Sequence, residues 1–320
     1  MRLDDFVARY PGIRLAEPGD NARILDFFDR SPMETRATDV QYRRSPDFFK
    51  LLRFQAERAH VFLAIDASEE VHAVGTATLR PGWAHGKPIT IGYLGDLRIG
   101  FDRKVIAHWR TFYGGLMAGA REIEELADCG CWFTAILDDN ALARRSLARG
   151  RTGAPVYVPL APFTMRNVVA RLPLGRRTLR GGWNVRTARP GDANRIDAFF
   201  EGENARLSLG FRGEFSRRLR QWDGLAITDF VIAESGDAIM ACMAPWSPSA
   251  AKHTIVRHIP RTLRMLGVIP GRRIRIPSAG EPLRMAYLTH LTFGSGVTAA
   301  ARGDVFRSML DHVFDRWPEA

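Results

Sequence analysis

The sequence is poor in cysteine and in lysine. Its three cysteines, Cys129, Cys131 and Cys242, are too few for a disulfide framework, and a Cys-Gly-Cys pair lacks the spacing of a usual zinc half-site. We therefore expect reduced, structural thiols and no bound metal. Only four of the 46 basic residues are lysine, so arginine carries nearly all of the net charge of +11.

Long apolar runs are missing too. A membrane-spanning helix needs roughly 18 apolar residues in a row, and the sequence has no such run. The first ten residues, MRLDDFVARY, carry acids where a secretory signal has a basic patch and an apolar core. We expect a cytoplasmic protein without a membrane span.

The signatures of several enzyme classes are also absent. There is no Gly-x-Ser-x-Gly elbow, no Walker loop, no His-Glu-x-x-His pair and no dinucleotide-binding glycine fingerprint. These absences argue against the corresponding hydrolases, nucleotide-binding proteins and metalloproteases.

Arginine gathers in two places, RLPLGRRTLR at 171–180 and RHIPRTLRMLGVIPGRRIRIP at 257–277. Such clusters neutralise phosphates on a cofactor, RNA or acidic lipid, or form solvated linkers and loops. Aromatic residues do not interleave with these arginines as RNA-stacking surfaces usually require, which disfavours a nucleic-acid partner.

The most informative feature is a duplication. RLAEPGDNARILDFF at 14–28 is nearly repeated as RTARPGDANRIDAFF at 186–200, with nine of fifteen positions identical. Unrelated segments would share about one, and an internal repeat changes the fold prediction. A chain of 320 residues is also comfortable for two domains.

Both copies predict the same local structure. An extended lead-in reaches a Pro-Gly turn, and Asp20 or Asp192 then stands where a carboxylate can cap the amides of a helix start. After the cap, Ile24, Phe27 and Phe28 recur at i, i+3 and i+4, which predicts a buried helix face.

The first half predicts an alternation of strands and helices. Strands are expected at 13–16, 61–66, 72–79, 89–99, 131–137 and 155–170, and helices from residue 20 and at 45–59, 101–127 and 140–150.

The second half repeats this order. Strands at 229–235 and 238–246 match the first hairpin, and the strand at 283–293 matches 89–99, with three identities in YLGDL and YLTHL; a helix follows at 300–317. The repeat offset grows from 172 to 194, which predicts an insertion near 257–280. We expect a domain at 1–172, a linker at 173–182 and a domain at 183–320 that lacks the C-terminal strands of the first.

This strand order resembles the GNAT superfamily of acyl-CoA-dependent N-acyltransferases, here as a tandem pair with an α/β (mixed-sheet α+β) fold. The central-strand motif of the family is matched by Asp96-Leu97-Arg98-Ile99, and Lys104 stands at its basic or Gln position. Ala107 and Trp109 occupy the two glycine positions of the CoA-binding loop, so the motif is degenerate. In ILDDNALARRSLARG, Asn140 and Ala143 match the second signature.

The resemblance implies acetyl-CoA or another acyl-CoA as co-substrate, no metal, and a small-molecule or peptide amine as acceptor. It implies transfer of an acyl group, most directly acetyl, with Asp96 as general base and a backbone N–H near Ile99 polarising the thioester. Leu147 stands where the family has its tyrosine acid, and Tyr157 is the nearest other phenol. The implied cofactor-binding residues are Leu97, Arg98, Ile99, Arg103, Lys104, Val105, Ile106, Ala107, Asn140 and Ala143.

Several alternatives stay open on the sequence alone. Asp96 is equally explained as a strand-end aspartate bonded to backbone or to Arg98, and Arg103 and Lys104 as an ordinary basic helix start. His290 takes the place of Asp96 in the second copy, as a base or as a satisfied core histidine. The whole chain also fits a non-catalytic GNAT-like binding protein or an aminoacyl-tRNA-dependent transferase. Oligomeric state and the identity of the active copy are not predicted.

Overall fold

The structure is a computed structural model that describes residues 1–31, 40–100, 102–138, 140, 143–145, 155–166, 168, 183–257, 278 and 280–316. The chain divides into two compact units. Unit 1 comprises Met1–Pro81, Pro88–Met165 and Ala251–Arg257, and unit 2 comprises Gly82–Lys87, Arg166–Ala250 and His258–Ala320. Each unit therefore includes a short segment from the other half of the sequence. The expected linker at 173–182 lies outside the described residues, as does most of the expected insertion.

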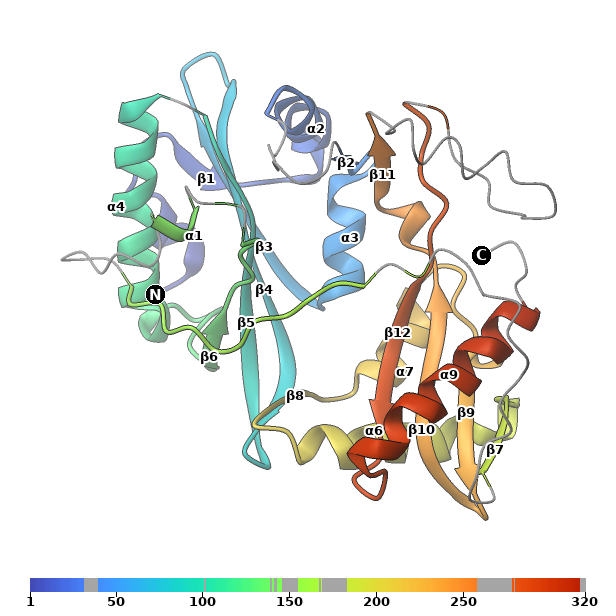
Figure 1. Cartoon of the computed structure of the whole chain (residues 1–320). Coiled ribbons are helices and arrows are strands. Elements are labelled where there is room, and N and C mark those ends of the chain that lie inside the picture. The colour runs from blue at the N-terminus through green and yellow to red at the C-terminus, as the bar shows by residue number, and fades with distance from the viewer. Residues whose placement is uncertain are drawn as a thin grey trace. The chain divides into compact units, whose positions relative to one another are not determined.

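Unit 1 is a mixed sheet with helices on both faces (Figure 1). Its strand order is β1-β3-β4-β5-β6; β1 and β4 run antiparallel to β3, and β6 runs parallel to β5. The strands are β1 (Ile13–Leu15), β3 (Arg58–Ile65), β4 (Val71–Ala84), β5 (Lys87–Ile99) and β6 (Cys129–Phe133). The helices are α1 (Leu3–Val7), α2 (Asn21–Arg30), α3 (Phe48–Gln55) and α4 (Arg103–Gly119), with 3-10 turns η1 (Pro18–Asp20) and η2 (Ala120–Glu122).

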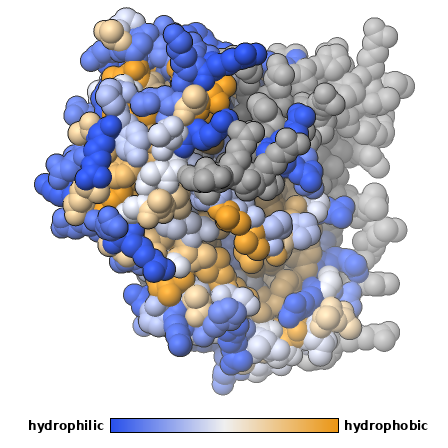
Figure 2. All heavy atoms as spheres, turned by 90° about the vertical axis from the view of Figure 1, so that its left-hand side faces the viewer, coloured by the Kyte–Doolittle hydropathy of each residue, from blue (hydrophilic) through white to orange (hydrophobic). Residues whose placement is uncertain are grey.

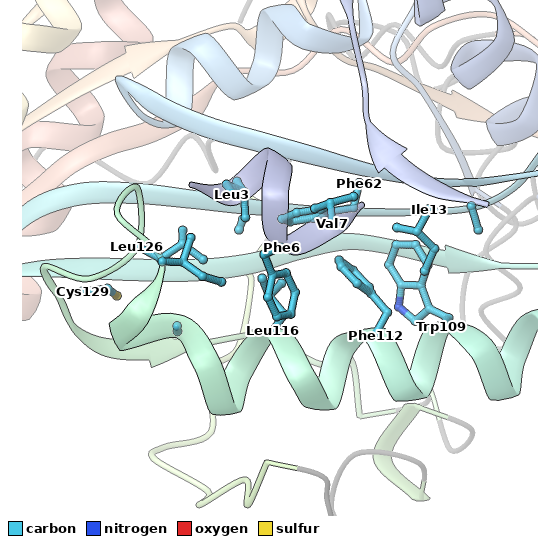
Figure 3. Close-up of a cluster of buried hydrophobic side chains, with 14 of the residues drawn as sticks. Leu3, Phe6, Val7, Ile13, Phe62, Trp109, Phe112, Leu116, Leu126 and Cys129 are labelled. Carbon is cyan, nitrogen blue, oxygen red and sulfur yellow. The ribbon is translucent and has the colours of Figure 1, made fainter. Parts of the chain in front are cut away.

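The alternation of side chains along β3 builds a core on each face of this sheet. Phe62 belongs to the cluster that packs under α1 and α4, and Figure 3 shows it with Phe112 and Trp109 of α4. Leu63 points the other way, into a cluster formed with the apolar faces of α2 and α3. The unit is therefore a three-layer structure, in which the sheet separates two hydrophobic cores.

Unit 2 repeats the first four strands in the order β7-β9-β10-β12, all antiparallel. Its core joins the sheet to the apolar side of α9 through Val305, Met309 and Val313. The strands are β7 (Trp183–Thr187), β9 (Val231–Ser235), β10 (Ala238–Trp246) and β12 (Tyr287–Phe293). The helices are α6 (Ala193–Ala205), α7 (Glu214–Gln221) and α9 (Ala299–Arg316), with 3-10 turns η3 (Pro190–Asp192), η4 (Ile227–Asp229) and η5 (Pro248–Ala250).

Two short pairings explain the exchanged segments. In unit 1, β2 (Val40–Arg43) pairs with β11 (His253–Val256), which comes from the second half of the sequence. In unit 2, β8 (Leu209–Phe211) pairs with Gly82–Ala84, the tip of the β4–β5 hairpin. Neither pairing was predicted, because each joins segments that are far apart in the sequence.

The mixed α/β class and the duplicated strand order are confirmed, but the strand expected at 155–170 is wrong. Residues 155–166 form no regular secondary structure, and Val156 and Val158 are 80% and 81% exposed. Figure 2, which looks from the side of α4 in Figure 1, shows hydrophobic residues interrupting the mostly hydrophilic surface in several places. Alternating apolar residues predict a strand only where a neighbouring strand accepts their hydrogen bonds.

The expected helix caps at Asp20 and Asp192 are confirmed only in part, since each carboxylate accepts one backbone amide, that of Glu17 or Arg189, at the start of the 3-10 turn before the helix. Neither carboxylate bonds the amides of the helix that follows. Asp20 instead binds Arg14 through two bonds of 2.6 Å, and Asp192 binds Arg186 at 2.7 and 3.0 Å. In each copy the repeated arginine and the repeated aspartate form a bidentate ion pair, which closes the Pro-Gly turn.

The two copies also share an unusual backbone at the centre. Asp96 on β5 and His290 on β12 both have left-handed φ values, 51° and 56°. Just beyond, Gly100 donates to His72 O and Gly294 donates to Met240 O, each at 2.7 Å. Around His290 the pairing of β12 with β10 shifts register, and we call the left-handed residue of each unit, Asp96 or His290, its bulge. The same bulge and the same strand exit therefore occur in both units.

Candidate active site

The central strand of unit 1 separates from its parallel neighbour. Pairing between β5 and β6 stops at Tyr93 and Phe133, and Thr134 Oγ1 then donates to Leu94 O at 2.8 Å. β5 continues to Ile99 without β6, so its last residues keep one edge unpaired by that strand. Leu97 in this stretch is 46% exposed. The end of β5 thus has a backbone edge that β6 does not pair, beside an exposed apolar side chain.

Asp96 lies in this stretch and is held by an arginine. Arg44 donates to Asp96 Oδ1, is only 8% exposed, and stands over the Phe48 ring at 5.3 Å. A left-handed φ at a non-glycine residue is uncommon, and here it turns the carboxylate out of the regular strand pattern. The sequence suggested Arg98 or backbone as the partner; the structure shows Arg44, 52 residues away.

Arg98 points elsewhere. Its guanidinium donates to the carbonyls of Phe28 and Ser31 at 2.7 and 2.8 Å and stacks on the Phe28 ring at 3.9 Å. Burial lowers the pKa of Arg98 to about 10, a change that Asp96 opposes. Arg98 therefore ties β5 to the end of α2, and its proposed part in cofactor binding rests on its backbone.

Two other residues near Asp96 were not predicted. Burial, followed by the charge of Asp96, raises the pKa of Tyr93 above its usual range. Burial and then Arg44 lower the pKa of Lys252, whose ammonium lies 4.2 Å from the centre of the Tyr42 ring. No motif marks these positions, and Lys252 reaches unit 1 only through the β2–β11 pairing.

The start of α4 is already capped by a carboxylate. Asp102 Oδ1 accepts the amides of Lys104 at 2.6 Å and Val105 at 3.3 Å, and Asp102 O accepts that of Ile106. The amides that the sequence assigned to a phosphate thus have acceptors within the helix start. Arg103, Lys104 and Ala107 are exposed, so the positive side chains remain available there.

Trp109 does not lie in the phosphate loop. It stands in the second turn of α4, buried in the core beside Phe112 (Figure 3). Gly75 of β4 makes room for it, since a Cβ at this glycine would lie 2.6 Å from Trp109 Cζ2. The tryptophan that made the motif look degenerate is a packing residue.

The second signature also has structural contacts. Asn140 Oδ1 accepts the amide of Ala143 at 3.0 Å, as a helix cap does. Tyr157 shares a short hydrogen bond with the hydroxyl of Tyr113 on α4, and burial raises the pKa of both phenols. The raised pKa keeps both phenols protonated at neutral pH and also makes them weaker acids than an exposed tyrosine.

The equivalent place in unit 2 is apolar. The rings of Phe200, Phe230, Trp222 and Phe215 surround His290 at centroid distances of 5.1 to 6.4 Å. Both ring nitrogens are buried, and neither has a hydrogen-bond partner among the described residues. Burial and the charge of Arg218 hold the pKa of His290 well below its usual value. The expected satisfied core histidine is therefore buried but unsatisfied.

Comparison with known proteins rests on structure. No family model matches the sequence, and no curated protein matches it. The structure is similar to part of a fungal multi-domain GH3 β-N-acetylglucosaminidase in which a GCN5-related glucosamine N-acetyltransferase region exists, with TM-score 0.54 and 11% identity, over 94% of this chain and 33% of that one. It is also similar to Saccharomyces cerevisiae N-myristoyltransferase with bound myristoyl-CoA, with TM-score 0.50 and 12% identity, over 96% of this chain and 73% of that one.

The chain has the GNAT fold.

Both similarities extend over nearly the whole chain, as expected for two GNAT-like units in tandem. Within the GNAT fold, the separated end of β5, the bulge at Asp96 and the start of α4 belong to one region of unit 1. Unit 2 keeps the bulge at His290 and the strand exit at Gly294, but the described residues show no strand beside β12 in the place of β6. No described helix is long and apolar enough to cross a bilayer.

Proposed function

We propose that the protein is an N-acyltransferase that moves an acyl group, most directly acetyl, from acyl-CoA to an amine, and that unit 1 is the active unit. The observation that carries this proposal is the end of β5, where pairing with β6 stops at Tyr93 while the strand runs on to Ile99. A thioester placed along this edge finds backbone N–H groups for its carbonyl oxygen, near Ile99 in our proposal.

Asp96 is the proposed base. Among the described residues its only hydrogen bond comes from Arg44 to Oδ1, which leaves Oδ2 for the substrate amine. The amine nitrogen bonds to the thioester carbonyl carbon, one amine proton passes to Asp96, and the carbon–sulfur bond breaks. CoA leaves as a thiolate and takes a proton from water or from the Tyr157–Tyr113 phenol pair. Positioning and one proton transfer supply most of the catalysis.

The start of α4 fits the diphosphate of CoA by side-chain charge. Arg103 and Lys104 are exposed there, whereas the Asp102 carboxylate occupies the amides that a phosphate would otherwise bind. We therefore assign the phosphates to Arg103 and Lys104 and leave Val105 and Ile106 to shape the pocket. The acyl group would run toward Leu97, and Asn140 and Ala143 would line the cofactor on the other side.

The test is binding followed by turnover. Titration calorimetry with acetyl-CoA and with longer acyl-CoAs should show micromolar binding that Arg103→Ala/Lys104→Ala weakens, with Arg110→Ala, exposed on the same helix, as control. Thiol release should then depend on an added amine. Absence of binding at millimolar acyl-CoA would overturn the proposal in favour of a non-catalytic GNAT-like protein. The aminoacyl-tRNA alternative has no support in the described residues, since both arginine clusters lie almost entirely outside them.

A further inference from the structure

Positive charge is concentrated around the Asp96 carboxylate. Arg44, Arg98 and Lys252 all interact electrostatically with Asp96. Asp29 also acts on Arg98, but it stands 3.9 Å from Arg43, a further cation. The cations of this group therefore outnumber its carboxylates.

Two of these cations lack a full set of partners. Arg44 is 8% exposed, and its Nη1 atom is buried without a hydrogen-bond partner among the described residues. Lys252 is half-buried, and the contact that the structure gives its ammonium is the face of the Tyr42 ring. Leaving a buried charged donor without a partner is costly, so such groups usually meet an anion.

Lys252 reaches the neighbourhood of Asp96 from the second half of the sequence. Residues 251–257 follow β10 in the second half of the sequence but belong to unit 1, where β11 pairs with β2 from His253–Arg43 to Val256–Val40. The pairing sets Lys252 beside Tyr42, near enough to Arg44 and Asp96 for both charges to act on its ammonium. A lysine carried in from so far along the sequence is not needed to close the sheet of unit 1, which lacks β11.

We propose that Arg44 and Lys252 form an anion subsite beside Asp96, and that the amine acceptor of unit 1 carries an acidic group, a carboxylate or a phosphate. This assignment of the acceptor class rests on the proposed acyltransferase function. The acidic group pairs with Lys252 and the free Nη1 of Arg44, which holds the amine next to Asp96 Oδ2. Neutral amines of the same shape lose these charge-assisted bonds.

Turnover gives the first test. Thiol release from acetyl-CoA is measured for matched amines, an amino acid against its amide and O-phosphoethanolamine against ethanolamine. We expect one acidic member to exceed its neutral partner by at least about tenfold in kcat/KM. Lys252→Met should remove this preference, mainly through KM, while Lys87→Met, on an exposed lysine at the start of β5, should keep it. The two pairs distinguish a carboxylate from a phosphate.

Chemical labelling tests the subsite without turnover. The chain has four lysines, so a short pulse of acetic anhydride read by mass spectrometry resolves each one. Propionate or inorganic phosphate bound at the subsite raises the pKa of Lys252, which slows its labelling; Lys87 should be unaffected, and chloride at equal ionic strength is the control.

The outcomes separate the two proposals. Protection of Lys252 without any acyl transfer would leave the anion subsite standing and overturn the acyltransferase function. Acyl transfer with equal rates for acidic and neutral amines, and no protection of Lys252 by either anion, would do the reverse.

Discussion

Units 1 and 2 each have a bulge at the equivalent place, but the residue at the bulge and its surroundings differ between the two units. At Asp96 the bulge carries a carboxylate among arginine and lysine, while at His290 it carries a neutral imidazole among aromatic rings. The backbone geometry is the same, with φ values of 51° and 56°. The comparison shows that the fold preserves the bulge independently of the side chain, so reactivity depends on what surrounds it.

The two units also differ in how a strand residue and a helix residue share the volume of the core near the bulge. Gly75 and Met243 each lie three residues after the residue whose carbonyl accepts the strand-exit amide, His72 or Met240. Trp109 and Val305 each lie seven residues after the residue at the helix start, Asp102 or Thr298. The two pairs therefore occupy equivalent positions in the two units. Unit 1 therefore has a small strand residue under a large helix residue, and unit 2 divides the volume more evenly. Each pair lies in the core of its own unit.

The largest effect should come from the bulge residues themselves. Replacing Asp96 by Asn, which tolerates left-handed backbone, should lower kcat by about 10²–10⁴-fold because the base is lost. His290→Gln should leave kcat within about twofold. Thiol release measures both, and thermal unfolding shows that the variants are folded. Equal losses in the two variants would show that activity is not confined to unit 1.

The next effect distinguishes the two ion pairs of the repeat. Arg186 binds Glu234 as well as Asp192, whereas Asp20 is the one described carboxylate that Arg14 binds. Arg186→Met removes the shared partner of two mostly buried carboxylates, which then keep only Arg195 as an ion-pair partner among the described residues, and should destabilise unit 2 by about 2–4 kcal/mol. Arg14→Met should cost unit 1 about 1–3 kcal/mol. Hydrogen exchange of β9 and β3 amides reports each unit separately, and a larger loss for Arg14→Met would contradict this ranking.

A smaller effect tests the size exchange in the cores. Gly75→Ala brings a Cβ to within 2.6 Å of Trp109 and should destabilise unit 1 by about 1–3 kcal/mol. Gly19→Ala is the control, because no atom lies within 4 Å of its Cβ position. The double variant Gly75→Met/Trp109→Val, which has the residues of unit 2 at both positions, should lose less stability than the sum of its two single variants. Denaturant unfolding measures all of these variants, and a loss in the double variant equal to that sum would reject the exchange.

The smallest effect is a dependence of unit 2 on pH. The unfolded chain takes up a proton on His290 below its ordinary pKa of about 6.5, whereas the folded unit does not, because burial and Arg218 lower the pKa. Stability should therefore fall as pH drops from about 6.5, by at most about 1.4 kcal/mol per pH unit. His290→Phe should remove this slope. Unfolding of both proteins between pH 7 and 5 measures it, and parallel curves would contradict the assignment.

The sequence predicted the helices and strands better than the contacts that they make with one another. The repeat located α2 and α6, and YLGDL and YLTHL located the strands β5 and β12, because these signals are local; the bulges on those strands were not predicted. The ion pair of Asp96 with Arg44 and the pairing of β2 with β11 join residues 52 and about 210 positions apart, and no local pattern encodes them. The strand expected at 155–170 failed for the opposite reason, since its pattern is right for a strand but no described strand pairs with residues 155–166.

The sequence also identified important residues more reliably than it predicted what those residues do. Asp20 was recognised through the repeat, yet it binds Arg14, a second repeated residue, and the amide of Glu17 before the turn, not the amides of α2. Trp109 was counted against the CoA site, but it belongs to the core beside Gly75. Matching residue types identify which positions matter, and contacts across the sheet decide why.

The route of β11 sets an order on biosynthesis. The ribosome makes the sheet strands of unit 1 by residue 133, but the strand that pairs with β2, and Lys252 just before it, leave the exit tunnel only after β7, β9 and β10 have been made. A nascent chain released early would therefore carry a sheet with its acid at Asp96 and an incomplete subsite. Finishing unit 1 waits for most of unit 2, so the two halves of the duplication mature together.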